Sequence, residues 1–167
     1  MSNLPVEFQI HLDQKFPFLG NRKILLAASG GLDSTVLGHL LKLLRLNFEV
    51  AHVNFGLRSD SEIDERFVKL LAGSWNVPFH NISFDTKTYA QEKGISVQMA
   101  ARDLRYEWFS KICKENGIDF IFTAHHADDN LETFLIHFLR GSGLDGLCGI
   151  PQRNDNIIRP LLPFSKR

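Results

Sequence analysis

Short apolar runs alternate with longer segments of helical periodicity along this chain, and that alternation limits the folds available to it more than any other feature. Four apolar runs are typical of buried strands, at 23–28, 48–53, 77–84 and 119–123. Apolar residues at a spacing of three and four predict four helices, over 33–46, 61–74, 97–116 and 128–139. Because strands joined through helices need crossover connections, we predict an α/β fold with a parallel twisted sheet and helices on both faces.

Two further expectations concern the arrangement of these elements. A helical lead-in over 1–22 precedes the main domain, which spans 23–167. In helix 61–74, Ser61 is a candidate N-cap. The apolar periodicity predicts that the buried face of this helix consists of Ile63, Phe67, Leu70 and Leu71.

Composition and charge exclude several classes of protein. Apolar residues make up 44% of the chain and charged residues 23%, which argues against collagen-like, low-complexity and disordered chains. Lys and Arg total 19, as do Asp and Glu, and this zero net charge argues against binding nucleic acid over the whole surface. The balance is uneven, however, because residues 140–167 hold five basic and two acidic side chains that could contact phosphate.

Cysteine content and hydropathy bear on the compartment. Cys113 and Cys148 are too few for a disulfide framework or a four-thiolate zinc site, which favours a reduced, cytoplasmic protein. The most apolar stretch, 35–46, is interrupted by basic side chains and is too short to span a membrane, so we expect no membrane contact. Residues 1–14 lack a cationic region followed by an apolar core, so we expect no signal peptide.

The loop after the first predicted strand, residues 29–34 (SGGLDS), lies where ligands bind in open α/β sheets. Its two glycines permit unusual backbone conformations, and successive N–H groups can then surround an anion. The following helix N-terminus adds donors, which favours a phosphate site. Asp33 fits such a site when a divalent cation lies between it and the phosphates; alternatively, it caps the helix. No Gly-Lys-Ser/Thr follows, so the loop is not a Walker A motif.

Arginines follow the second predicted strand and occupy the long predicted helix. Arg58 ends the segment 52–58 (HVNFGLR), where it can pair with an anion or be an ordinary surface residue. Arg102 and Arg105 are three residues apart and share a helix face, and a guanidinium binds phosphate through a planar fork. The alternative is a solvated pair balanced by neighbouring carboxylates.

The loop after the fourth predicted strand carries five ionisable side chains within eight residues, namely His125, His126, Asp128, Asp129 and Glu132. Asp129 and Glu132 share a helix face and can together hold an ammonium group or a metal ion. Asp128 is a candidate helix cap. A metal held by protein ligands alone is an alternative, although no spacing typical of a known site is present.

The loop at 29–34 resembles the Ser-Gly-Gly-x-Asp-Ser signature of the PP-loop ATP pyrophosphatases, which cleave ATP between the α and β phosphates and adenylate a substrate oxygen. Across most of its length the chain resembles, more specifically, the catalytic domain of the tRNA(Ile)-lysidine synthetase family. The matching segments are 29–34, 52–58, 101–106, 123–133, 140–150 and 159–162. Phe55 departs from the family pattern, which usually has His there, so no role for that imidazole is carried over.

This resemblance implies a Rossmann-like PP-loop ATPase fold with ATP and Mg²⁺ as cofactors. It implies ATP-dependent ligation of L-lysine to the wobble cytidine of an isoleucine tRNA with a CAU anticodon. The reaction passes through an adenylated cytidine and releases pyrophosphate and AMP. A homodimer is among the assemblies to be expected. Because the family pattern continues beyond the last residue, we expect a catalytic domain truncated before C-terminal tRNA-binding domains.

The resemblance also implies the roles of individual residues. The catalytic set is Asp33, His125 and Arg105, with Arg102 a second candidate for ATP. The ATP-binding set is Ser29, Gly30, Gly31, Leu32, Asp33, Ser34 and Arg105. Mg²⁺ is held by Asp33 through the phosphates, and lysine by Asp129 and Glu132. The expected tRNA contacts are Arg58, Arg140 and Arg153.

Two other functions stay open on the sequence. Another PP-loop tRNA-modifying enzyme, such as a thiolase, would share the loop at 29–34, but thiolases that act on cytidine typically need cysteine pairs, and Cys113 and Cys148 do not form a Cys-x-x-Cys. A non-catalytic ATP-binding module would share it too. In such a module Asp129 and Glu132 would have no chemical task.

Overall fold

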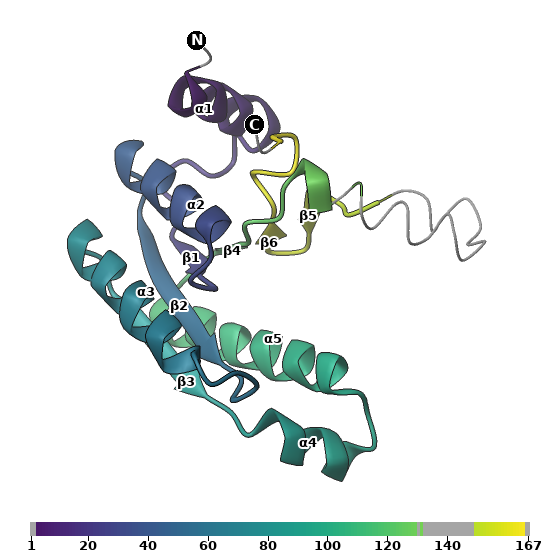
Figure 1. Cartoon of the computed structure of the whole chain (residues 1–167). Helices are drawn as coiled ribbons and strands as arrows, with labels where there is room; N and C mark the ends of the chain where they lie inside the picture. Colours follow the sequence, from purple (N-terminus) through teal and green to yellow (C-terminus); the bar gives the residue numbers. More distant parts are fainter. Residues whose placement is uncertain (1–2, 130, 132–148, 166–167) are drawn as a thin grey trace.

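The computed structural model describes residues 3–129, 131 and 149–165, and the strands within these ranges form one sheet (Figure 1). The strands are β1 (Ile24–Ala27), β2 (Phe48–Asn54), β3 (Phe79–Ser83), β4 (Phe120–Phe122), β5 (Arg153–Asn154) and β6 (Ile157–Ile158). Their order is β3-β2-β1-β4-β6-β5, and among the paired strands only β5 runs antiparallel to its neighbour. The predicted α/β fold with a mostly parallel sheet is confirmed, whereas the short β5–β6 pair was not predicted.

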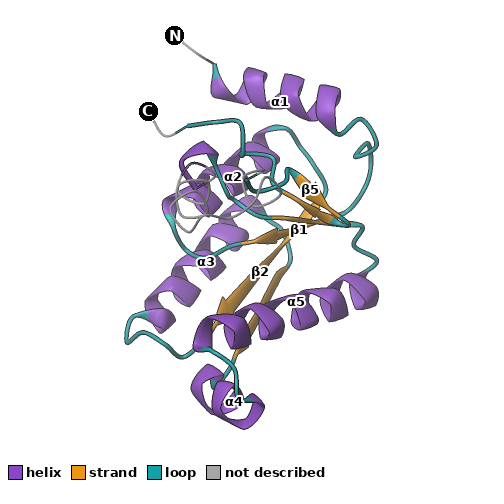
Figure 2. Ribbon diagram, turned by 90° about the vertical axis from the view of Figure 1, so that its right-hand side faces the viewer, coloured by secondary structure: helices purple, strands orange, loops and turns teal. Residues whose placement is uncertain are grey.

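Helices cover both faces of this sheet (Figure 2). The helices with described bounds are α1 (Leu4–Lys15), α2 (Leu32–Leu43), α3 (Ser61–Trp75), α4 (Thr86–Lys93) and α5 (Val97–Asn116). Side chains alternate between the faces of a strand, so Ile24 and Leu26 pack in one apolar cluster with α2 and α3. Leu25, between them, packs on the opposite face with Phe109 of α5. No helix of the described residues is long and apolar enough to cross a membrane.

Helix α5 has the bounds that the sequence predicts. Ser96 precedes it, and the Ser96 hydroxyl accepts a hydrogen bond from the Met99 N–H at 3.2 Å, which satisfies a donor of the first turn. Gly117 ends the helix with φ of 62°, a conformation that glycine adopts without strain. Helix α4, by contrast, was not predicted. It is mostly polar, with Ala90 as its buried apolar residue, and Asp85 caps it by accepting from the Thr88 N–H.

The buried face predicted for α3 is wrong at three of its four positions, whereas Leu71 packs against the core as predicted. Ile63, Phe67 and Leu70 are 66%, 42% and 74% exposed, and the residues that the helix buries are instead Val68, Ala72 and Trp75. The Trp75 ring lies against Gly38 of α2, where a Cβ would come within 2.2 Å of it. The contact with α2 therefore determines which face of α3 is buried. The apolar periodicity of α3 alone does not contain this information. The prediction of Ser61 as N-cap is also wrong, because Asp60 precedes the helix and the Ser61 hydroxyl donates to the Arg58 carbonyl.

The N-terminal helix packs against the main sheet layer. Phe8 and Leu12 of α1 are buried in the same apolar cluster as Ile24 and Leu26 of β1. The Phe8 ring also lies 6.1 Å from the ring of Phe164, and Figure 1 shows the C-terminal segment passing beside α1. The predicted helical lead-in therefore contains one helix, and its boundary at residue 22 stays a prediction.

The order of the strands fixes where a ligand can enter. From β1 the chain proceeds through β2 to β3 on one side, and α5 then carries it back to β4 on the other side of β1. The connections after β1 and β4 therefore diverge, which opens a crevice at the carboxyl ends of these two strands. The helix predicted over 128–139 begins there, at Ala127, and most of it lies outside the described residues.

Candidate active site

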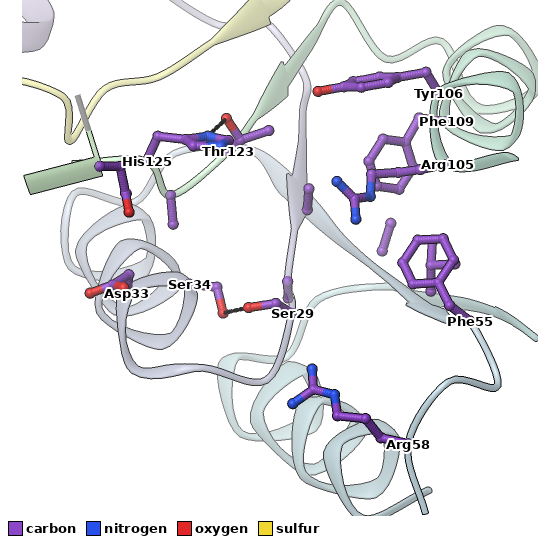
Figure 3. Close-up of a pocket in the computed structure, with 16 residues that line it drawn as sticks. Ser29, Asp33, Ser34, Phe55, Arg58, Arg105, Tyr106, Phe109, Thr123 and His125 are labelled. Atoms are coloured by element: carbon purple, nitrogen blue, oxygen red, sulfur yellow. Dashed lines mark hydrogen bonds between the residues drawn. The ribbon is translucent and has the colours of Figure 1, made fainter. Parts of the chain in front are cut away.

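A cavity of about 400 Å³ lies at the carboxyl ends of β1, β2 and β4, where the sequence predicts a site (Figure 3). The loops after these strands and one face of α5 enclose it. Its polar lining comes from Ser29, Asp33, Ser34, Arg58, Arg105, Tyr106, Thr123, His125 and Asp129. Its apolar lining comes from Ala27, Ala28, Ala51, Val53, Phe55, Phe109 and Ala124.

The loop at 29–34 forms one wall of the cavity, to which it contributes Ser29, Asp33 and Ser34. Gly30 has φ of +87°, and a Cβ there would lie 3.1 Å from the Asp64 side chain of α3, so only glycine fits well. The Gly31 N–H donates to the Ser29 hydroxyl at 3.3 Å, which in turn lies 3.4 Å from the Ser34 hydroxyl. Leu32 directs its side chain outward and is 69% exposed, so it can offer a ligand only its backbone.

The alternative role of Asp33 as a helix cap is wrong. Gly31 precedes α2, and no side-chain hydrogen bond caps the helix there, so the N–H groups of its first turn are available to a ligand. Asp33 lies within this first turn and lines the cavity. The wall therefore combines backbone donors with one carboxylate, as a site for a phosphate and a divalent cation requires.

The predicted arginines separate into two inside the cavity and two away from it. Arg105 and Arg58 line it, and Figure 3 shows both guanidinium groups directed into the space in front of Ser29. Arg102 is exposed and lies over the Tyr106 ring instead. Arg153 is on β5, 4.5 Å from the Phe18 ring, so the structure does not bring it to the cavity.

Arg105 is held by an aromatic ring. Its guanidinium lies 5.0 Å from the centroid of the Phe55 ring, and within the described residues no carboxylate pairs with it. Burial lowers the pKa of Arg105 and the charge of Arg102 adds to this effect, whereas Tyr106 raises the pKa. A guanidinium nevertheless stays charged at neutral pH. Arg105 thus offers an unneutralised positive charge to an anionic ligand.

His125 faces the same cavity from the segment after β4. Its Nδ1 lies 3.0 Å from the Thr123 hydroxyl. Burial is the largest influence and lowers the pKa of His125, and the positive charge of Arg159 lowers it further, while Asp129 raises it. The net shift is downward, so the ring is neutral near pH 7 and can accept a proton.

The acidic residues after β4 occupy the start of a helix. Asp129 lines the cavity, and its Oδ2 accepts a hydrogen bond from the His126 N–H at 2.9 Å. The Asp128 N–H donates to His126 Nδ1 at 3.2 Å, so the helix is capped by His126 and the prediction of Asp128 as cap is wrong. Glu132 and Arg140 lie outside the described residues, and so does Cys148.

Sequence reasoning missed the apolar part of the lining. Ala27 ends β1 and Val53 is the residue before the last of β2. Phe109 is one helical turn after Arg105 on α5, so the spacing of four from Arg105 was the available signal. It also missed the structural role of His52, whose Nδ1 lies 2.8 Å from the Ala28 carbonyl and ties β2 to the end of β1. Within the described residues, no group of three or more His, Cys, Asp and Glu side chains is placed to hold a metal ion.

Comparison with known proteins agrees with this geometry. The model of the PP-loop domain family matches residues 4–167, so the chain belongs to the PP-loop family. Within it, the chain is 51% identical over 149 residues to a tRNA(Ile)-lysidine synthase of Porphyromonas gingivalis, a match that covers 88% of this chain and 33% of that protein. A tRNA(Ile)-lysidine synthase of Bacteroides thetaiotaomicron is 46% identical over 157 residues, covering 93% of this chain and 37% of the other. The chain spans about a third of the length of these curated relatives.

Solved structures support the fold alone. The U34-tRNA thiolase NcsA from Methanococcus maripaludis, solved with its [4Fe-4S] cluster, superimposes with a TM-score of 0.75 at 16% identity, covering 96% of this chain and 60% of the thiolase. The NH3-dependent NAD synthetase from Campylobacter jejuni has a TM-score of 0.65 at 12% identity, covering 99% and 69%.

Proposed function

We propose that this chain binds ATP in the cavity and uses it to join lysine to the wobble cytidine of an isoleucine tRNA with a CAU anticodon. The observation that carries the proposal is the convergence of three features in one cavity. These are the uncapped N-terminus of α2, the unneutralised guanidinium of Arg105 and the carboxylate of Asp129. The names of the relatives supply the identity of the product. We place the reaction in the cytoplasm, and the expected homodimer stays a prediction.

ATP fits the cavity with its phosphates on the loop side and its base on the apolar side. The N–H groups at 29–34 and the hydroxyls of Ser29 and Ser34 offer donors to phosphate oxygens. Arg58 was expected to contact tRNA, but its direction toward Ser29 favours the phosphates of ATP. The apolar lining around Val53 and Phe109 suits an adenine base.

Mg²⁺ would be held by Asp33 together with phosphate oxygens of ATP. The donor set fits this role, because Mg²⁺ is usually bound by one or two carboxylates plus substrate phosphates. When bound, the ion would offset the negative charge that develops on the phosphates.

In the proposed reaction, the carbonyl oxygen of the cytidine attacks the α-phosphorus of ATP, and the bond to pyrophosphate breaks. The ε-amine of lysine then attacks the ring carbon that bears this oxygen, and AMP leaves with the oxygen. Arg105 and the loop donors stabilise the charge that grows on the departing pyrophosphate. His125 accepts the proton that the amine loses, since its lowered pKa leaves the imidazole neutral near pH 7.

Lysine recognition is assigned to Asp129 and, as a prediction, to Glu132. The carboxylate of Asp129 lines the same cavity as the guanidinium groups of Arg58 and Arg105, so the lining carries both charges. An ammonium group is attracted to the carboxylate and a triphosphate to the guanidinium groups.

A sulfur-transferring enzyme is the less favoured alternative. The chain has two cysteines, and Cys113 is buried on α5, where burial is the largest cause that raises the pKa of its thiol to about 11. Such a thiol is a weak nucleophile and a poor ligand for a cluster at neutral pH.

The substrates that AMP release requires distinguish these functions from one another. The chain is incubated with radiolabelled ATP, Mg²⁺ and tRNA, with and without lysine, and AMP is separated by chromatography. A lysine-joining enzyme releases AMP only when tRNA and lysine are both present. Release that needs tRNA but not lysine would favour another PP-loop chemistry. Tight ATP binding without AMP would favour a non-catalytic module.

A further inference from the structure

His126 is a buried, titratable side chain that has no part in the proposed reaction. It is 7% exposed and, unlike His125, does not line the cavity. Its Nδ1 faces the N–H and the carboxylate of Asp128, and its Nε2 faces the carboxylates of Asp33 and Asp129, so the two sides of the ring have roles that can be distinguished.

The contacts on the Nδ1 side are with Asp128, whose carboxylate Oδ2 lies 3.6 Å from Nδ1. The Asp128 N–H donates to His126 Nδ1 at 3.2 Å, so Nδ1 is an acceptor. In a neutral imidazole the other nitrogen then bears the hydrogen, which makes Nε2 a donor. This contact by itself is a helix cap.

The contacts on the Nε2 side join two carboxylates from different parts of the chain. His126 Nε2 lies 3.4 Å from Asp33 Oδ2 and 3.5 Å from Asp129 Oδ2. Asp33 belongs to α2 after β1, whereas Asp129 belongs to the helix start after β4. The ring therefore lies between the segment that follows β1 and the segment that follows β4. Two converging carboxylates repel, and a polarised Nε2–H in close contact with both offsets part of that repulsion.

We propose that His126 is a positioning residue that uses its Nε2–H to hold Asp33 and Asp129 at a fixed separation. This inference rests on the proposed function. The carboxylate assigned to ATP and the carboxylate assigned to lysine are held at a constant distance from each other. His126 acts through these two residues and touches neither substrate.

Two substitutions separate the bridge from the cap. In His126→Asn, the amide oxygen takes the place of Nδ1 and can cap the helix, but the side chain is too short to reach both carboxylates. In His126→Gln, the amide nitrogen takes the place of Nε2 and can reach them, while the cap is lost. His39, which is exposed on α2, supplies the matched control His39→Asn.

We expect His126→Asn to keep the melting temperature within a few degrees of the wild type while kcat/KM for both ATP and lysine falls about tenfold to a hundredfold, as when a supporting side chain of a reactive group is lost. His126→Gln should retain more activity at a lower melting temperature. The proposal is overturned if activity follows stability, with His126→Asn fully active and His126→Gln impaired.

A spectroscopic measurement tests the same contact without turnover. In protein labelled with ¹⁵N-histidine, we expect the signals of His126, assigned by their loss in His126→Asn, to show a protonated Nε2 and an unprotonated Nδ1. A proton on Nδ1 would contradict the bridge. Because this readout needs no substrate, it stands even if the wild type forms no lysine product, an outcome that would instead contradict the proposed function.

Discussion

At the scale of single residues, the lining of the cavity carries both charges. Arg105 sits on the Phe55 ring with no carboxylate partner within the described residues, and Arg58 points toward the same loop. Asp33 and Asp129 both lie close to His126, and Asp33 also belongs to the wall formed by the loop at 29–34. Positive and negative side chains in one cavity suit two substrates of opposite charge. Exchanging one charged residue should therefore affect one substrate more than the other.

Asp129→Asn tests this division. The substitution removes the charge while keeping an oxygen that can accept from the His126 N–H. We expect the KM for lysine to rise about tenfold or more, the loss of one charge-assisted contact, with a much smaller rise in the KM for ATP. Steady-state kinetics with each substrate varied in turn measures both. Equal changes in the two constants would show that the division of roles is wrong.

Arg105→Ala should weaken ATP binding by about tenfold to a hundredfold, because a charge-assisted hydrogen bond contributes ~1.5–3 kcal/mol. Arg102→Ala is the matched control, since Arg102 is three residues away on α5 but exposed and outside the cavity. Isothermal titration calorimetry with ATP measures both. If the two variants bind ATP equally well, Arg105 does not contact the nucleotide.

At the scale of elements, contacts between segments decide which side chains of a helix or strand are buried, and the apolar periodicity of the sequence does not predict these contacts. Helix α3 turns Val68, Ala72 and Trp75 inward because Gly38 of α2 leaves room for the indole. Strand β2 carries a buried carboxylate, Glu49, which is tolerated because neighbouring elements supply cations. Both features lie away from the cavity, so substitutions at these positions should change the stability of the fold more than the reaction in the cavity.

Gly38→Ala should destabilise the fold by about 1–3 kcal/mol, because the added Cβ would overlap the Trp75 ring. Gly73→Ala on α3 is the control, since a Cβ there meets nothing within 4 Å. In a helix this second change should instead stabilise by about 0.5–1 kcal/mol. Urea denaturation measures the two shifts, and shifts of the same sign would contradict this packing of α3 on α2.

The Glu49 cluster predicts a pH dependence of stability. Glu49 lies 2.5 Å from Lys23 Nζ and 2.6 Å from His80 Nε2. Burial raises the pKa of Glu49, but hydrogen bonds and charges from Lys23 and His80 lower it more, so the folded pKa is below the ordinary value. The stabilisation is therefore complete above the ordinary carboxyl pKa and is lost as pH falls through the folded pKa.

Denaturant unfolding from pH 7 to pH 3 measures this effect. Glu49→Gln should unfold more easily at pH 7, by about 1–3 kcal/mol, and should lose less stability on acidification than the wild type. Parallel pH profiles for the two proteins would show that Glu49 is not the group responsible.

At the scale of the whole molecule, the parallel sheet and the location of the cavity could be predicted from the sequence, whereas the order of the strands could not. Alternating strands and helices predict a parallel sheet, and the loop at 29–34 is identifiable because two consecutive glycines lie between two serines. The part that could not be predicted arises from distant segments meeting. Phe55 beneath Arg105, His126 between two carboxylates and the Phe8–Phe164 contact join residues that no local pattern relates.

The most direct measurement is the mass of the nucleosides of the tRNA after reaction. An isoleucine tRNA with a CAU anticodon is incubated with the chain, ATP, Mg²⁺ and isotopically labelled lysine, then digested and analysed by mass spectrometry. We predict one cytidine heavier by one lysine less one water, formed only when ATP is present and absent with Asp129→Asn at low lysine. AMP released with no lysine-bearing cytidine would contradict the proposed function.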